Sequence, residues 1–132
     1  MFRLVKILNG RINQGEPVRL PSKPSTTYSF GQALSLSGGM LVSATGKPDF
    51  ICCEDYSAPA SDNRDVLVEP VSADMVFEAP FSAAPTSVNV GDKVKLASDG
   101  LQLSSDTTSG VATIFDKCGA TNAGDKCLVQ FK

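Results

Sequence analysis

The feature that most constrains the fold is an internal repeat, in which the second half of the chain follows the first at a nearly constant spacing. Residues 31–36 match residues 91–96 at an offset of 60, and glycine opens both segments. With one extra residue in the second copy, the match continues at an offset of 61 and pairs 39–43 with 100–104, 50–55 with 111–116 and 66–69 with 127–130. Such recurrence indicates two copies of one supersecondary unit.

Each copy has the pattern of short strands joined by turns. Apolar residues alternate or run together over 33–36, 40–43, 50–54 and 66–69 in the first copy, and over 111–115 and 127–131 in the second. This pattern predicts strands at those positions. We expect turns where Gly and Asp, which tolerate positive φ, fall between the strands: Gly31, Gly39, Gly91, Asp92 and Gly100.

The predicted fold class is all-β: a small β-barrel or sandwich from two degenerate strand–turn repeats, with an N-terminal strand or arm. Two copies could close one barrel with pseudo-two-fold symmetry and few exposed edges. The length of 132 residues suits a single β domain over 17–132. Within it, repeat one covers about 17–71 and repeat two about 76–132, while residues 1–16 form the N-terminal strand or arm.

The N-terminal segment has two open interpretations. Its residues 2–7 are mostly apolar but carry two basic side chains. As an arm, the segment could dock on another chain, with a candidate interface made of Phe2, Arg3, Leu4, Val5 and Lys6. As an alternative, it forms an edge strand of the same domain.

Composition argues against several classes of function. The chain has no His, which excludes Ser–His and Cys–His nucleophile pairs. Its net charge is −2 and its basic residues are scattered, so we expect no nucleic-acid partner. No apolar run approaches the ~20 residues that cross a bilayer, so we expect no membrane association. The start does not have the pattern of a signal peptide, so we expect the chain to be made in the cytoplasm. No motif indicates a cofactor or a metal, and we expect no enzymatic activity and no catalytic residues.

The cysteines do not have the spacing of a zinc site or of a dense disulfide framework. Cys52 and Cys53 are adjacent, so in a strand one thiol would be buried and the other would point outward. We expect free thiols, and the best candidate for a disulfide is Cys118 with Cys127. Acidic residues at strand ends, such as Glu54, are expected to be solvated.

Three short motifs in the second half resemble one protein family. They are Gly-Asp-x-Val at 91–94, Gly-Val-Ala at 110–112 and Gly-Asp-x-x-x-Val at 124–129. In this order they resemble the small capsid cement, or decoration, proteins of tailed bacteriophages, and the resemblance covers roughly residues 17–132. The first half departs from the pattern, because Gln32 replaces the Asp of the first turn and Phe-Ile-Cys-Cys at 50–53 replaces the first Gly-Val-Ala.

The resemblance implies a structural virion protein that binds the outer surface of a phage capsid and stabilises it. It implies the major capsid protein as partner, a homo-oligomer such as a trimer, and location on the virion surface after synthesis in the host bacterial cytoplasm. The alternatives are another virion component, such as a head-fibre base or a tail protein, and a carbohydrate- or protein-binding β module.

Overall fold

The computed structural model describes residues 1–8 and 16–132, and this part of the chain is all-β, as predicted. The alternating apolar runs form strands because they place one set of side chains inward and the other outward. Within the described ranges, no helix is long and apolar enough to cross a membrane. The strands of the described residues are β1 (Arg3–Ile7), β2 (Val18–Pro21), β3 (Thr27–Tyr28), β4 (Ala33–Ser37), β5 (Met40–Ser43), β6 (Phe50–Cys52), β7 (Tyr56–Ser57), β8 (Asp65–Pro70), β9 (Met75–Pro80), β10 (Lys93–Val94), β11 (Ala112–Asp116) and β12 (Lys126–Gln130).

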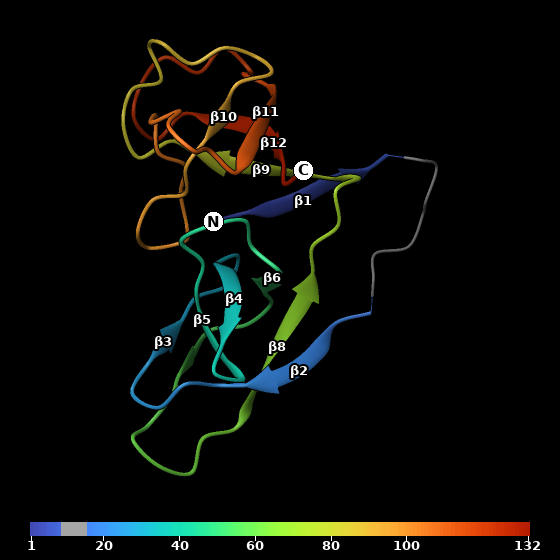
Figure 1. Ribbon diagram of the computed structural model, residues 1–132, viewed down its shortest axis with the longest axis vertical. Coiled ribbons are helices and arrows are strands. Elements are labelled where there is room, and N and C mark those ends of the chain that lie inside the picture. Colours follow the sequence, from blue (N-terminus) through green and yellow to red (C-terminus); the bar gives the residue numbers. More distant parts are fainter. Residues whose placement is uncertain (9–15) are drawn as a thin grey trace.

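Two five-stranded antiparallel sheets divide these strands into two units (Figure 1). Unit 1, which comprises β2 to β8, has the order β2-β8-β6-β4-β5, and β3 pairs separately with β7. Unit 2, which comprises β9 to β12, has the order β9-β12-β11-β10 and is extended by β1 on the outer side of β9. Without β1 and β5, the strand orders of the two sheets correspond one to one.

The strand registers identify the equivalent positions of the two units. In unit 1 Val18 faces Val68, and in unit 2 Phe77 faces Val129, so these strands are related by offsets of 59 and 61. Ile51 faces Ala33, as Thr113 faces Lys93, which gives β6 and β11 an offset of 62.

The predicted offset of 61 is therefore wrong by one residue in β11, and the hairpin that precedes this strand explains the difference. Leu36 pairs with Leu41 in unit 1, whereas Leu96 pairs with Leu103 in unit 2, so the second turn is two residues longer rather than one. The chain from Ile114 to its partner Val129 is one residue shorter than the chain from Cys52 to its partner Val68, and this restores the offset of 61 in β12.

Neither sheet closes into a barrel. In each unit one parallel bridge joins the two sides of the sheet, Ser22 with Leu41 in unit 1 and Phe81 with Leu103 in unit 2. The single barrel that two copies could have formed is not present in the described chain, because the main strands of each unit pair within that unit. The fold is a pair of open, curled sheets.

Two hydrophobic cores fill these sheets. The smaller lies within unit 1, around Tyr28, Leu34 and Val66. The larger lies under the sheet of unit 2 but also takes in Phe2 from β1's start and Ile51 from unit 1. The larger core therefore holds the two units together as well as stabilising unit 2.

Candidate functional site

The start of the N-terminal segment packs into the protein itself. The Phe2 side chain is 1% exposed, and its ring centroid lies 5.4 Å from that of Phe131, which also contacts Phe77. Leu4 is half-buried against the same core. The Phe2 N–H donates to the Gly31 carbonyl at 2.8 Å, which ties this end of the chain to unit 1. Of the two interpretations, the structure shows the edge strand, paired with β9.

The remaining candidate interface residues lie on the outside of this strand. Arg3 Nη2 is 3.5 Å from Glu78 Oε1, and the Arg3 side chain is 63% exposed. Lys6 Nζ lies 4.4 Å from the centroid of the Phe115 ring, while Val5 is exposed. A bulge falls between Leu4 and Lys6. Charged side chains and a bulge are common protections of an edge strand against unwanted pairing.

The predicted turns at Gly31 and Gly91 form the same hydrogen bonds in both units. Both glycines have positive φ, 77° and 91°. The Gly31 N–H donates to the Cys52 carbonyl at 2.8 Å, and the Gly91 N–H donates to the Ile114 carbonyl at 2.9 Å. These acceptors occupy equivalent positions at the offset of 62.

Gln32 forms the same side-chain contact as Asp92, although the two residues differ chemically. Gln32 Oε1 accepts the Ser29 N–H at 3.1 Å, as Asp92 Oδ2 accepts the Asn89 N–H at 2.8 Å. Gln32, at the position that Asp92 holds in unit 2, therefore preserves the turn. An amide oxygen and a carboxylate oxygen are both acceptors of the required reach.

These two turns present exposed apolar side chains. Phe30, immediately before Gly31, is 49% exposed, and Val90, immediately before Gly91, is 63% exposed. Asp55 Oδ1 accepts the Phe30 N–H at 2.8 Å and fixes the first turn against the loop after β6. The two units thus carry an apolar residue at the same exposed position.

Gly39 and Gly100 both lie in turns with positive φ, as predicted, but their surroundings differ. Gly39 lies in the β4–β5 hairpin with φ of 79° and open space around it. Gly100 lies against unit 1, where its carbonyl accepts the Ala33 N–H at 2.7 Å and a Cβ would come within 2.9 Å of the Ala33 carbonyl oxygen. We call this contact, together with the Phe2–Gly31 contact, the seam between the units.

A pocket of about 260 Å³ opens at this seam. Both units contribute to its lining: β1 and β9 from one side, β6, β8 and the Gly31 turn from the other. Most of its walls are apolar or aromatic, and one carboxylate reaches it. The residues that define its chemistry are Phe2, Phe30, Ile51, Cys53, Glu69 and Phe77.

Glu69 is the unusual member of this lining. Its Oε1 is buried and has no hydrogen-bond partner among the described residues. Burial raises the pKa of the Glu69 carboxyl above its usual value. Burial, with a contribution from Glu69, also raises the pKa of the Cys53 thiol to about 11, so this thiol is neutral at pH 7. No sequence motif includes Glu69, although the repeat aligns it with Gln130.

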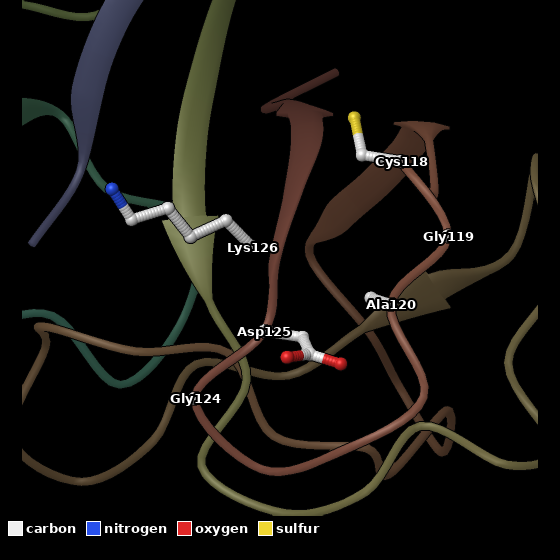
Figure 2. A pocket seen from close by; sticks show the side chains of 6 residues that line it. All are labelled: Cys118, Gly119, Ala120, Gly124, Asp125 and Lys126. Carbon is white, nitrogen blue, oxygen red and sulfur yellow. The ribbon is translucent and has the colours of Figure 1, made fainter.

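A second, shallower hollow lies inside the loop between β11 and β12 (Figure 2). Figure 2 shows the Asp125 carboxylate turned under the loop, while Lys126 extends away from it. Asp125 Oδ2 accepts the N–H groups of Thr121 and Asn122 at 2.9 and 2.8 Å, which lowers the pKa of the Asp125 carboxyl. Lys126 Nζ lies 3.0 Å from Glu78 Oε1. Both charges are engaged by the protein itself, so neither is available for a ligand.

All four cysteines are free thiols. Cys52 is buried and Cys53 is partly exposed, as the strand pattern predicted. Cys118 is exposed and Cys127 is buried, and the candidate disulfide between them does not form in this structure. Burial raises the pKa of the Cys127 thiol to about 12, which keeps it unreactive.

Glu54 is not simply solvated, as the sequence had suggested, but joins three segments of unit 1. Its carboxylate accepts two hydrogen bonds from Arg64, at 2.8 and 3.1 Å, and one from the Leu67 N–H at 2.7 Å. Arg19 Nη1 lies 3.6 Å away. The Arg64 hydrogen bonds are the largest cause of a Glu54 pKa lowered to about 2. The arrangement stabilises the sheet, and a carboxylate so fully paired is unsuited to proton transfer near neutral pH.

Within residues 1–8 and 16–132, no group of three or more Cys, Asp or Glu side chains could hold a metal ion. The pocket at the seam, with Glu69 in its wall and Phe30 at its side, is therefore the strongest candidate for a functional site. Comparison with protein-family models and with curated proteins gives no match for this chain.

Proposed function

We propose that the protein is a structural virion component that binds the outer surface of a phage capsid and stabilises the shell. The exposed apolar pair Phe30 and Val90 is the observation that carries this proposal. Single exposed apolar side chains are ordinary, but their recurrence at one position of two similar units suggests a selected contact surface. A symmetric shell offers repeated binding positions to such a surface, and the sequence motifs resemble those of capsid decoration proteins.

The same observations favour protein adhesion over sugar binding. All nine aromatic residues lie in the described part of the chain. Of these nine, Phe30 is the one with an exposed side chain. A carbohydrate-binding face commonly stacks several exposed aromatic rings against the sugar, and one ring at the edge of a pocket offers little such area.

Co-sedimentation tests the proposal directly. The purified chain is mixed with empty shells assembled from the major capsid protein of the phage that encodes it, and we expect saturable binding. Phe30→Ser and Val90→Ser should each weaken binding at least tenfold. Leu36→Ser is the matched control, because Leu36 is also exposed, at 44%, but lies in the β4–β5 hairpin. Failure of the unaltered chain to sediment with the shells would overturn the proposed function.

A further inference from the structure

Equivalent positions near the ends of β8 and β12 carry different chemistry in the two units. Glu69 in β8 pairs with Ile51, as Gln130 in β12 pairs with Thr113, so the two side chains occupy the same place in their sheets. Gln130 is 2% exposed, and its Nε2 donates to the Ala73 carbonyl at 3.1 Å. In unit 2 this place therefore holds a neutral, satisfied amide.

In unit 1 the same place holds a carboxylate whose Oε1 is buried without a partner in the described chain. Buried polar groups are nearly always hydrogen-bonded, and burying a charge without a counter-charge is costly. A glutamine, as used in unit 2, would avoid this cost. The carboxylate is thus a candidate for a functional rather than a stabilising group.

The surroundings of Glu69 define what could pair with it. The rings of Phe2, Phe30 and Phe77 contribute to the walls of the pocket, and the neighbouring Cys53 thiol is neutral. Aromatic rings attract cations through their negative faces, and a carboxylate attracts them by charge. The pocket volume of about 260 Å³ is below the roughly 300–1,000 Å³ typical of sites for drug-sized ligands. A single long cationic side chain fits this combination of charge, apolar wall and size.

We propose that the pocket at the seam receives one basic side chain, lysine or arginine, of a partner protein, with Glu69 as its counter-ion. The partner is the capsid shell protein, an assignment that rests on the proposed function, whereas the chemistry of the site stands on Glu69 and its aromatic surroundings. The butyl or propyl stem of the side chain contacts the Phe30 ring, which is 49% exposed, and its charged end reaches the carboxylate. Phe30 then joins the exposed contact surface to the pocket.

Arg3 is the one cation among the described residues that lines this pocket, and it is engaged elsewhere. Its guanidinium lies 3.5 Å from Glu78, on the outer side of the sheet, and its side chain is 63% exposed. Burial alone accounts for the raised pKa of Glu69, with no contribution from Arg3. The pocket is therefore open to a cation from another molecule.

Side-chain analogues test the site without the partner. Chemical shifts of backbone amides are followed by NMR while n-butylammonium, N-butylguanidinium or the neutral n-butanol is added at pH 7 and low salt. We expect saturable shifts at Phe30, Cys53 and Glu69 with either cation, and the stronger of the two identifies lysine or arginine. Glu69→Gln should weaken binding at least tenfold, because it removes the charge and keeps the shape found in unit 2. Equal affinity for n-butanol, or for the Glu69→Gln variant, would overturn the site.

Two control variants make the result specific. Asp65→Asn removes an exposed carboxylate at the other end of β8 and should leave the affinity within twofold of the unaltered chain. Arg3→Ala tests whether this lining residue competes with the added cation, and an affinity within twofold is expected if it does not. A tenfold gain in that variant would show that Arg3 competes for Glu69 as an internal partner, and this would overturn the assignment to another protein.

Shell binding separates the site from the proposed function. If Glu69→Gln loses both the cations and the shells, the site and its partner are supported together. If it loses the cations but sediments with shells like the unaltered chain, the shell protein is not the source of the side chain, although the decoration role stands. If the unaltered chain binds the cations but not the shells, the proposed function fails while the site remains.

Discussion

Units 1 and 2 share a strand order but end their sheets differently, and the difference shows how an edge strand is protected. In unit 1 the Leu67 N–H donates to the Glu54 carboxylate, and the Leu67 carbonyl accepts the Cys53 N–H. Both bonds lie on the side of β8 away from β2. The hydrogen bonds to β2 must therefore come from Val68 and Val66, on either side of Leu67. Arg19, which lies opposite Leu67, then has its main-chain N–H and C=O facing outward. The outer edge of β2 thus offers the Arg19 N–H as a donor with no partner strand among the described residues.

Prolines flank this single donor. The main-chain groups of Pro17 and Pro21 face outward like those of Arg19, because alternate residues of a strand have the same orientation. Neither proline has an N–H to offer a neighbouring strand. In unit 2 the position of Pro17 is taken by Val76, and β1 pairs there instead. One unit is closed to further strands by proline, and the other is closed by the chain's own N-terminus. Unit 2 should therefore depend on β1 in a way that unit 1 does not.

The largest expected effect breaks that dependence. Phe2→Ala removes a ring that is 1% exposed and packs on Phe131, so we expect the free energy of unfolding to fall by about 3–5 kcal/mol. Chemical denaturation measures the loss. Hydrogen exchange should accelerate in β9 and β12 more than in β8. Equal acceleration in both units would contradict the view that β1 chiefly supports unit 2.

The next prediction places the carboxylate of unit 1, found at Glu69, at the equivalent position of unit 2, Gln130. Gln130→Glu places a carboxylate beside the Ala73 carbonyl in a site that is 2% exposed, where a donor is needed. We expect a loss of roughly 3 kcal/mol at pH 7, because a buried acceptor faces another acceptor and carries a charge. Denaturant titration gives the value, and repetition at pH 4, where the new carboxyl is protonated and can donate, should recover part of it.

Much of the fold follows from local pattern, because period-2 alternation and turn glycines act within a few residues. The predicted strands at 33–36, 40–43 and 66–69 correspond closely to β4, β5 and β8. The length of the second hairpin did not follow, since Gly100 lies in a turn like Gly39 but also contacts Ala33 across the seam. A turn glycine in the sequence does not reveal that its backbone also approaches a distant segment.

The candidate site could be predicted only in part. The turns at Gly31 and Gly91 were visible because the residues that form them are adjacent in sequence. The role of Glu69 was not, because its pocket exists only where β1 crosses to unit 2 and brings Phe2 beside β8. Glu54 shows the same limit, since its partner Arg64 lies ten residues farther along the chain.

A smaller effect sharpens the comparison of the two glycine turns. Gly91→Ala forces a left-handed conformation on alanine but meets no atom within 4 Å, so it should cost about 1–2 kcal/mol. Gly31→Ala carries the same cost and also places its Cβ 2.6 Å from the Met1 Cβ. We expect it to lose about 1 kcal/mol more, measured by thermal unfolding. Equal losses would mean that the N-terminal residue moves aside freely and does not hold the seam.

The smallest effect has the opposite sign and depends on pH. Because burial raises the folded-state pKa of Glu69, the carboxyl stabilises the fold most when protonated, and this stability is lost as the pH rises through the folded value. Glu69→Gln should therefore match the unaltered chain below a pH of about 4, the unfolded pKa of glutamate. At pH 7 the variant should unfold at a higher temperature than the unaltered chain. Its free energy of unfolding should be higher by less than about 1 kcal/mol, because the side chain keeps some contact with solvent. Calorimetry across this pH range measures the difference, and a variant less stable at pH 7 would show that the Glu69 charge already has a partner in the free protein. A gain in stability together with a loss of cation binding would identify Glu69 as a residue kept for binding at the expense of the fold, in contrast to Gln130 at the same place in unit 2.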